Sequence, residues 1–192
     1  IQGVGHVGGY LAEKLHAAGA ILTIADVNQA ALNAVAAKTG ATIVSTDAIF
    51  DVEADVFAPC ALGGAISAAT LPRLKVKVIA GGANNQLADA MIGQTVFDRG
   101  ILYAPDYVIN GGGIINVAAE IRALEAGGAF DGGWVATKLD RLAQTLAEVI
   151  DQSIAEKRPA NLVAAGQLPD RTPLDPGITS NTSEQLLGPA GC

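Results

Sequence analysis

The sequence predicts an α/β fold with a doubly wound, mostly parallel sheet, and three observations support the prediction. Short apolar runs of strand length alternate along the chain with segments of helical periodicity. Half of the 192 residues are hydrophobic but only 4% are aromatic, so an aliphatic core is expected, as in parallel sheets buried on both faces. The motif G-x-G-x-x-G spans residues 3–8, and Asp26 follows its last glycine by eighteen positions. This combination is typical of a Rossmann-like, dinucleotide-binding domain.

Each glycine of the motif has an expected mechanical role. Gly3 allows a tight turn, Gly5 lets a pyrophosphate approach the backbone, and Gly8 lets the following helix pack on the sheet. That helix presents its free N–H groups to the phosphates. The apolar run 20–25 is strand-like and ends at Asp26, where a carboxylate accepts from both ribose hydroxyls and repels a 2′-phosphate. The predicted cofactor is therefore NAD rather than NADP; the alternative is a glycine-rich turn with a helix-capping aspartate.

The first strand is expected to be truncated. A Rossmann motif follows its first strand, yet only Ile1 and Gln2 precede Gly3. We therefore expect the chain to be part of a longer protein, with a Rossmann domain over 1–165 and an irregular tail over 166–192.

The remaining pattern alternates between strands and helices until residue 111 and is helical afterwards. Asn28 is expected to cap the second helix, and Pro59 to end a strand because proline cannot donate to a ladder. The stripes over 114–124 and 139–154 are interpreted as core or interdomain faces, and little pattern follows Pro159. The expected helices are 6–18, 28–40, 67–74 and 87–99, and the expected strands are 20–25, 41–44, 54–58, 76–80 and 101–104.

Composition excludes several classes of partner. The net charge of −7 disfavours nucleic acid and anionic membrane surfaces. No apolar run reaches transmembrane length, and no Cys/His cluster has the spacing of a metal site. Cys60 and Cys192 do not make a disulfide framework. A cytoplasmic enzyme domain that acts on a small molecule is the expectation.

The strand ends carry the polar side chains that a ligand crevice needs, because ligands of open α/β sheets bind beyond the carboxyl ends of the strands. Asn84 and Asn85 have amides that suit a nicotinamide, a ribose or a substrate carboxylate, although a simple turn is an equal alternative. Asn110 precedes three glycines, and the same two interpretations, a ligand-binding amide and a simple turn, apply to it. Cys60 is interpreted as a small packing residue near the cofactor rather than a nucleophile, since no base is evident beside it. His6 is expected to start the first helix and contact the cofactor.

Four segments resemble the cofactor-binding domain of the Glu/Leu/Phe/Val amino-acid dehydrogenase family: residues 3–8, 55–64, 83–87 and 103–118. The resemblance implies NAD-dependent oxidative deamination of an L-amino acid to its 2-oxo acid and ammonium, by an enzyme that forms homo-oligomers. In this family a preceding domain supplies the catalytic lysine and aspartate. The resemblance therefore leaves no catalytic residue in this chain, and the 192 residues alone are expected to have no dehydrogenase activity.

The resemblance also assigns binding residues. Asn85 is implied to hold nicotinamide and substrate, while Ile114 and Val117 line the side-chain pocket. Two aliphatic groups suit leucine or another branched side chain and disfavour glutamate; phenylalanine or valine dehydrogenation and a non-catalytic NAD-sensing module are the alternatives. The predicted cofactor-binding residues are Gly3, Val4, Gly5, His6, Val7, Gly8, Asp26, Val27, Cys60, Ala61, Asn85 and Asn110, and the predicted substrate-binding residues are Asn85, Ile114 and Val117.

Overall fold

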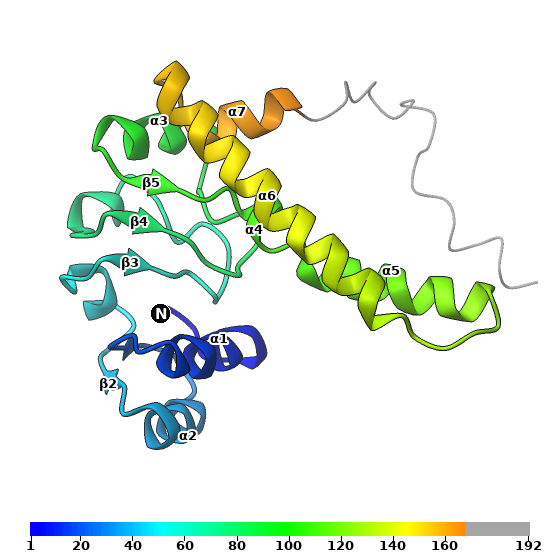
Figure 1. Ribbon diagram of the computed structural model, residues 1–192. Helices are drawn as coiled ribbons and strands as arrows, with labels where there is room; N and C mark the ends of the chain where they lie inside the picture. The colour runs from blue at the N-terminus through cyan, green and yellow to red at the C-terminus, as the bar shows by residue number, and fades with distance from the viewer. Residues whose placement is uncertain (168–192) are drawn as a thin grey trace, which may run out of the picture.

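A computed structural model describes residues 1–167 of the chain, and Figure 1 shows its arrangement. Most of the predicted tail over 166–192, from residue 168 onward, lies outside the described residues. The strands are β1 (Thr23–Ile24), β2 (Thr42–Ile43), β3 (Val56–Phe57), β4 (Val78–Ile79) and β5 (Leu102–Tyr103). The helices are α1 (His6–Ala17), α2 (Gln29–Thr39), α3 (Ala90–Asp98), α4 (Asp106–Ile109), α5 (Gly112–Glu125), α6 (Gly132–Glu156) and α7 (Ala160–Gln167), with 3-10 turns η1 (Ala48–Asp51) and η2 (Leu71–Arg73).

The sheet is parallel and is joined at its centre by the first residues of the chain. β1 pairs with β2, and β3, β4 and β5 pair in that order, all in parallel. Gln2 forms parallel bridges to both Ala25 and Pro59, so residues 1–3 lie between the two halves. The N–H of Gly3 donates to Ala25 O at 2.7 Å, and the N–H of Cys60 donates to Gln2 O at 2.7 Å. The predicted Rossmann-like α/β class is confirmed.

Two hydrophobic clusters hold helices against the sheet. Ala12 of α1 and Leu32 and Val35 of α2 pack with Val4 and Ile24 on the β1–β2 half. The β3–β5 half has the larger cluster, which includes the aromatic pair Phe50 and Phe57 with ring centroids 5.6 Å apart. The other members of this cluster are Ala25, Ile49, Ile66, Leu71, Leu74, Ile79, Ile92, Val96, Ile101 and Tyr103. Burial of these side chains is the main stabilising contribution to the domain.

The predicted helix over 67–74 is wrong, because only the 3-10 turn Leu71–Arg73 forms there. Thr70 Oγ1 donates to Ala65 O at 2.6 Å and accepts from Ser67 N at 3.0 Å. Such local side-chain bonds offer the backbone an alternative to the helix. Pro72 adds to this effect, since it has no N–H and disfavours the helical region for the residue before it.

The C-terminal part is more helical than its sequence pattern indicates. α6 starts at Gly132, where Asp131 caps it by accepting from Trp134 N at 2.9 Å. α7 follows Pro159 directly and includes residues 166 and 167, the first two of the expected irregular tail. Pro159 O accepts from the N–H groups of Leu162 and Val163 at 3.0 and 3.1 Å. Val163 and Ala164 then pack with Val149 of α6 and Val108 of α4 in a third cluster.

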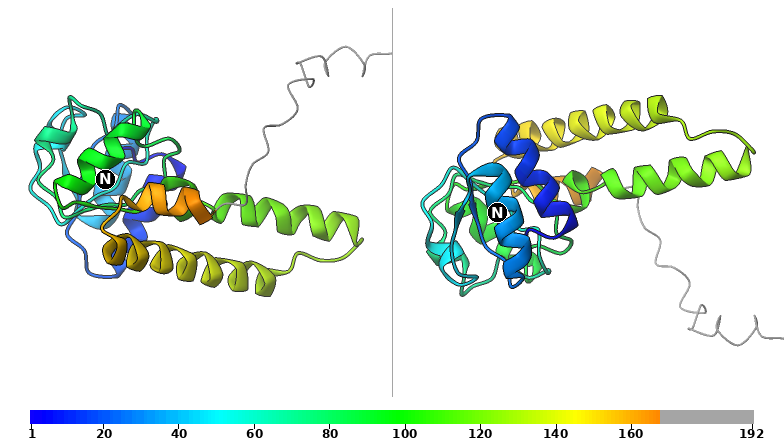
Figure 2. Two further views of the ribbon diagram at one scale, coloured as in Figure 1. Left: turned by 90° about the horizontal axis from the view of Figure 1, so that it is seen from above. Right: turned by 90° about the horizontal axis from the view of Figure 1, so that it is seen from below.

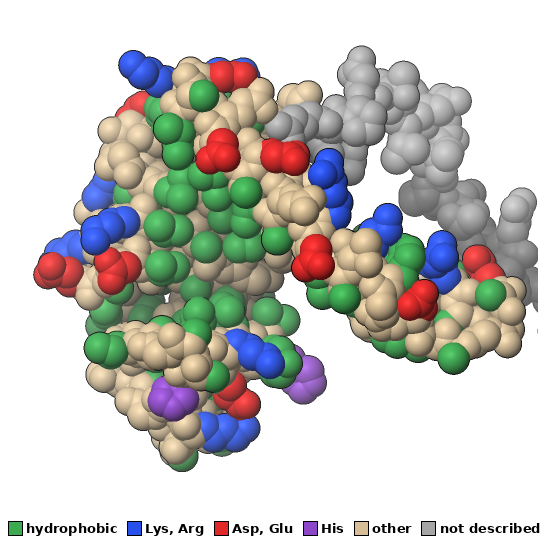
Figure 3. All heavy atoms as spheres, in the orientation of Figure 1, with side chains coloured by type: hydrophobic (Ala, Val, Ile, Leu, Met, Phe, Trp, Pro, Cys, Tyr) green, Lys and Arg blue, Asp and Glu red, His purple; other side chains and the backbone are tan. Residues whose placement is uncertain are grey.

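An arm formed by α5 and the first part of α6 (residues 112–139) projects from the body as an antiparallel pair (Figures 1 and 2). The apolar stripe of α5 is exposed, contrary to the core alternative: Ile114 is 74% and Leu124 82% exposed. Figure 3 shows hydrophobic side chains on the outer surface of this arm. Of the helices within residues 1–167, none has both the length and the apolar character needed to cross a membrane.

Arg73 links two acidic residues on the surface, Asp47 just before η1 and Asp51 within it. Its guanidinium lies 2.7 Å from Asp47 Oδ1 and 2.7 Å from Asp51 Oδ2. Hydrogen bonds from Arg73 hold the pKa of Asp47 and of Asp51 below its usual range. A carboxyl whose pKa is lower in the folded state adds stability above its unfolded pKa of about 4, and this stability is lost as the pH falls through the folded pKa.

We therefore expect Arg73→Met to lower the free energy of unfolding at pH 7 by a small amount, and the difference from the wild type to become smaller in acid. The effect is small because both carboxylates are largely exposed. Urea denaturation at neutral and acidic pH measures it. The control is Lys77→Met, which removes a pair with Asp55 whose side chains are 82% and 83% exposed and is expected to change nothing. A difference of the same size at acidic and at neutral pH would contradict the ionic explanation.

Candidate functional site

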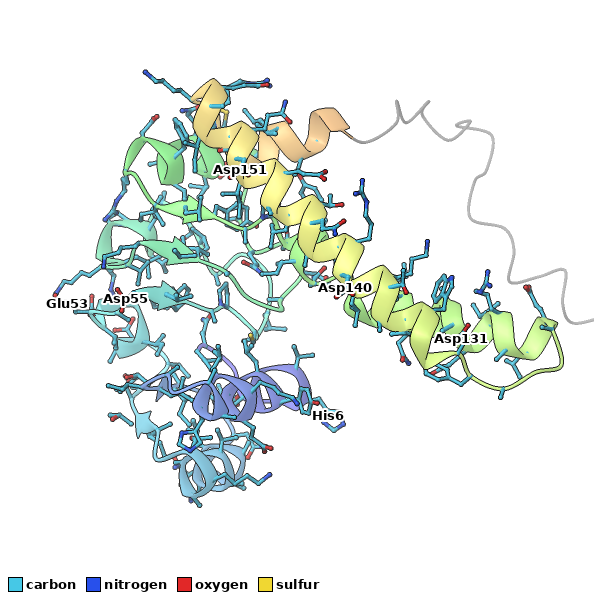
Figure 4. The ribbon with its side chains drawn as sticks, in the orientation of Figure 1. His6, Glu53, Asp55, Asp131, Asp140 and Asp151 are labelled. Atoms are coloured by element: carbon cyan, nitrogen blue, oxygen red, sulfur yellow. The ribbon has the colours of Figure 1, made fainter. Side chains whose placement is uncertain are left out.

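The predicted cofactor-binding residues gather at the carboxyl edge of the sheet, where the glycine loop and the loops after β1, β3, β4 and β5 meet. Bridges from Gln2 to Ala25 and to Pro59 place the glycine loop between the ends of β1 and β3. In Figure 4, His6 extends outward from α1 on the side toward which the arm projects, while Glu53 and Asp55 lie on the opposite side. The predicted crevice and the arm are therefore on the same side of the molecule.

The three motif glycines have different surroundings. Gly3 has a φ of +91°, and a Cβ at Gly8 would lie 1.9 Å from Gly3 O, so α1 approaches the loop too closely for any side chain. No atom lies within 4 Å of a Cβ built at Gly5, and Gly5 caps α1 without a side-chain hydrogen bond. The first N–H groups of a helix have no intrahelical partner. The start of α1 thus offers donors beside open space.

Asp26 is half-buried at the end of β1 and binds the glycine loop. Its Oδ2 accepts from Val4 N at 2.6 Å, and its Oδ1 accepts from Asn28 N at 2.8 Å. Each carboxylate oxygen has a second lone pair, so Asp26 retains acceptor capacity for hydroxyl groups. Val27 beside it is 93% exposed. Asn28 caps α2 as expected by accepting from Ala30 N and Ala31 N, so capping is the role of Asn28 rather than of Asp26.

Cys60 and Ala61 lie under the glycine loop. Ala61 N is 2.7 Å from a Cβ built at Gly3, and Cys60 Cβ is 3.0 Å from one built at Gly8. Cys60 Sγ accepts from Gly82 N at 3.4 Å. Burial raises the pKa of the Cys60 thiol, which disfavours the nucleophilic thiolate. The geometry supports the packing interpretation of this residue.

Asn84 and Asn110 bind each other, which joins the loop after β4 to the end of α4. The Asn110 amide donates to Asn84 Oδ1. Asn85 is exposed and has a φ of +52°, a left-handed conformation that asparagine tolerates better than most residues. Both the turn and the amide interpretations are therefore compatible with this segment, and the binding role of Asn85 stays a prediction.

Gln86 and Asp106 are buried polar residues of this edge that the sequence reasoning did not assign. Gln86 has no exposed surface and Asp106 is 8% exposed. Gln86 N donates to Asp106 Oδ2 at 3.2 Å, and Tyr103 OH donates to Asp106 Oδ1 at 3.2 Å. Burial, with the charge of Asp106 as a second cause, raises the pKa of Tyr103 far above its usual value, so this hydroxyl stays a donor. The signal in the sequence is the polar run after a buried strand, which does not distinguish Gln86 from its asparagine neighbours.

Ile114 and Val117 are not enclosed by the described residues. They are 74% and 50% exposed on α5, one helical turn apart on the arm. The glycines before them permit close packing of α5 against α6. A Cβ built at Gly111 would lie 3.3 Å from Leu142 of α6, and one built at Gly112 would lie 3.5 Å from Leu139. A cavity of about 470 Å³ between α3, β5, α6 and α7 contains none of the predicted site residues.

The chain is similar in sequence to amino-acid dehydrogenases. The glutamate/leucine/phenylalanine/valine dehydrogenase family matches residues 24–168. Leucine dehydrogenase from Bacillus cereus is 43% identical over 153 residues, which are 80% of this chain and 40% of that protein. Phenylalanine dehydrogenase from Lysinibacillus sphaericus is 48% identical over 126 residues, or 63% of this chain and 33% of that protein. The chain spans less than half the length of these relatives.

Solved structures show the same fold. L-tryptophan dehydrogenase from Nostoc punctiforme matches with a TM-score of 0.80 and 36% identity, over 86% of this chain and 48% of that chain. The hetero-hexameric glutamate dehydrogenase from Thermus thermophilus matches with a TM-score of 0.67 over 85% of this chain and 43% of that one, and at 19% identity this likeness concerns the fold alone. The matched segment, residues 24–168, is well over half of the chain. The resemblance seen in the sequence is confirmed: the chain belongs to the glutamate/leucine/phenylalanine/valine dehydrogenase family.

Proposed function

We propose that this chain is the NAD-binding domain of a cytoplasmic, homo-oligomeric L-amino-acid dehydrogenase that deaminates leucine or another branched-chain amino acid. Supporting this, relatives named leucine dehydrogenase are 40–51% identical to parts of the chain. Ile114 and Val117 present aliphatic surface on α5, which suits an apolar substrate side chain.

The observation that carries the proposal is the pairing of Asp26 with the glycine loop. One carboxylate oxygen of Asp26 accepts from Val4 N at 2.6 Å. The next residue, Gly5, has no atom within 4 Å of a Cβ built on it. A pyrophosphate fits the open space at Gly5, where N–H donors of α1 converge. A ribose fits the remaining acceptor capacity of Asp26. The residues present therefore fit a dinucleotide.

NAD, when bound, would accept the hydride that leaves the amino acid. The residues of this chain bind and orient the two reactants. Asn85 would direct its amide to the nicotinamide end, and Ile114 and Val117 would exclude water from the substrate side chain. No side chain of this chain is assigned as acid or base. The two alternatives keep the same cofactor site: a phenylalanine or valine dehydrogenase differs in substrate, and an NAD-sensing module would have none.

Titration of the 192-residue chain with NAD and NADP tests the cofactor assignment. We expect NAD to bind about tenfold or more tightly, because the Asp26 carboxylate would repel a 2′-phosphate. Asp26→Asn keeps the size of the side chain and an acceptor for Val4 N, so it is expected to reduce this preference while the fold persists. Equal affinity of the wild-type chain for the two cofactors would remove Asp26 from the site.

A further inference from the structure

Gln86 uses its side chain to close the turn that carries the two asparagines. Its Nε2 donates to Gly81 O at 2.7 Å and to Ala83 O at 3.0 Å, so both amide hydrogens are used within the turn. Gln86 has no exposed surface. The turn it closes contains Asn84, which binds Asn110, and Asn85 with its φ of +52°.

The backbone around Gln86 ties this turn to the neighbouring loops. Gln86 N donates to Asp106 at the start of α4, and Gln86 O accepts from Ile66 N at 2.9 Å. Gly64 N donates to Asn85 O at 2.7 Å. A Cβ at Gly63 would lie 2.9 Å from Asn84 O, so the loops after β3 and β4 touch through their main chains. Gln86 is therefore at the meeting point of three loops that form the predicted crevice.

Packing alone does not account for a glutamine in this place. Gln86 Oε1 is buried and has no hydrogen-bond partner among the described residues. A buried polar atom without a partner costs free energy, and an apolar side chain of similar size would avoid that cost. The donors of the amide, in contrast, satisfy two carbonyls of the turn. The free-energy cost of the unpaired Oε1 is offset because the amide N–H groups hold the turn in shape.

We propose that Gln86 is a positioning residue that sets the left-handed conformation of Asn85 and so aims the asparagine amides at the nicotinamide end of the cofactor. The inference rests on the proposed function of this edge as an NAD site. Gln86 itself touches no ligand; it acts through Asn85. Its loss should therefore affect the nicotinamide end and leave the adenosine end bound as before.

Calorimetric titration of the 192-residue chain with NAD and with ADP-ribose tests this. ADP-ribose shares the adenosine and the pyrophosphate but lacks nicotinamide. We expect Gln86→Met to weaken NAD binding by about tenfold, since hydrogen bonds that hold the turn are lost, and to leave the ADP-ribose affinity unchanged. The exposed Gln94→Met in α3 is the control and is expected to change neither affinity.

A second variant, Asn85→Gly, completes the test, because glycine keeps the left-handed backbone and removes the amide. If Gln86 acts through Asn85, the double variant loses no more NAD affinity than either single variant. Additive losses, or equal losses for NAD and ADP-ribose, would overturn the proposal. Should Gln86→Met fail to fold, Asp106→Asn, which alters the acceptor of Gln86 N at constant size, is expected to give the same selective loss.

The affinities of the wild-type chain for NAD and ADP-ribose distinguish a failure of this inference from a failure of the proposed function. Binding of neither ligand would contradict the NAD site itself. Equal affinity for NAD and ADP-ribose would leave the dinucleotide site standing but overturn a role of the turn at the nicotinamide end.

Discussion

Gly8→Ala is expected to lower the free energy of unfolding by about 3 kcal/mol or more, because an added methyl group overpacks a contact between two backbone segments. The new Cβ would lie 1.9 Å from Gly3 O and 3.0 Å from Cys60 Cβ. Neither neighbour is the end of a flexible side chain, so α1 must move away from the loop. Chemical denaturation of the 192-residue chain measures the loss, and NAD binding is expected to disappear with it.

Gly5→Ala is the matched control. No atom lies within 4 Å of the added Cβ, so the loss of stability is expected to be much smaller than for Gly8→Ala and to come only from the weaker capping of α1 by alanine. The methyl group would occupy the space proposed for the pyrophosphate, and NAD affinity should fall by about tenfold or more. A stable Gly8→Ala variant would contradict the described packing of α1. Unchanged NAD binding by Gly5→Ala would instead contradict the phosphate site.

Val117→Asp is expected to lower kcat/KM for leucine by about 100-fold or more in a full-length enzyme that carries this domain, since the new carboxylate would be desolvated against an apolar substrate. The 192-residue chain should keep its melting temperature, because Val117 is 50% exposed and the charge stays hydrated there. Val117→Thr, with nearly the same shape, is the control for size. Steady-state kinetics and melting curves provide both measurements. Full activity of Val117→Asp would remove α5 from the substrate pocket.

Ile114→Ala tests the same proposed pocket without a charge. Shortening this side chain should shift the ratio of kcat/KM values for phenylalanine and valine toward phenylalanine by about 1–2 kcal/mol, the value of one or two methylene groups in a pocket. Ile114 is 74% exposed, so the melting temperature should not fall. A uniform loss for all substrates, together with a lower melting temperature, would instead indicate that Ile114 packs against a neighbouring part of the protein.

The sequence by itself determined the fold class, because the signals for it are local. Apolar runs of strand length and stripes of period 3.6 are properties of consecutive residues, and they placed α1, α2 and the strands correctly. The close packing of α1 at Gly8 follows from a six-residue motif in the same way. Asn28 as the cap of α2 and the family itself were also readable, since a cap involves neighbouring residues and the motifs are contiguous.

Only the tertiary structure decided the features that depend on contacts between distant residues. α7 forms after a segment of weak pattern because Val163 and Ala164 pack on Val149 and Val108, more than ten positions away. Ile114 lies on a helical stripe like that of a core helix, yet the path of α5 away from the body leaves it exposed. Gln86 resembles its polar neighbours in the sequence until Asp106, twenty positions later, accepts its N–H. Periodicity encodes which face of an element is apolar, but the fold as a whole decides what covers that face.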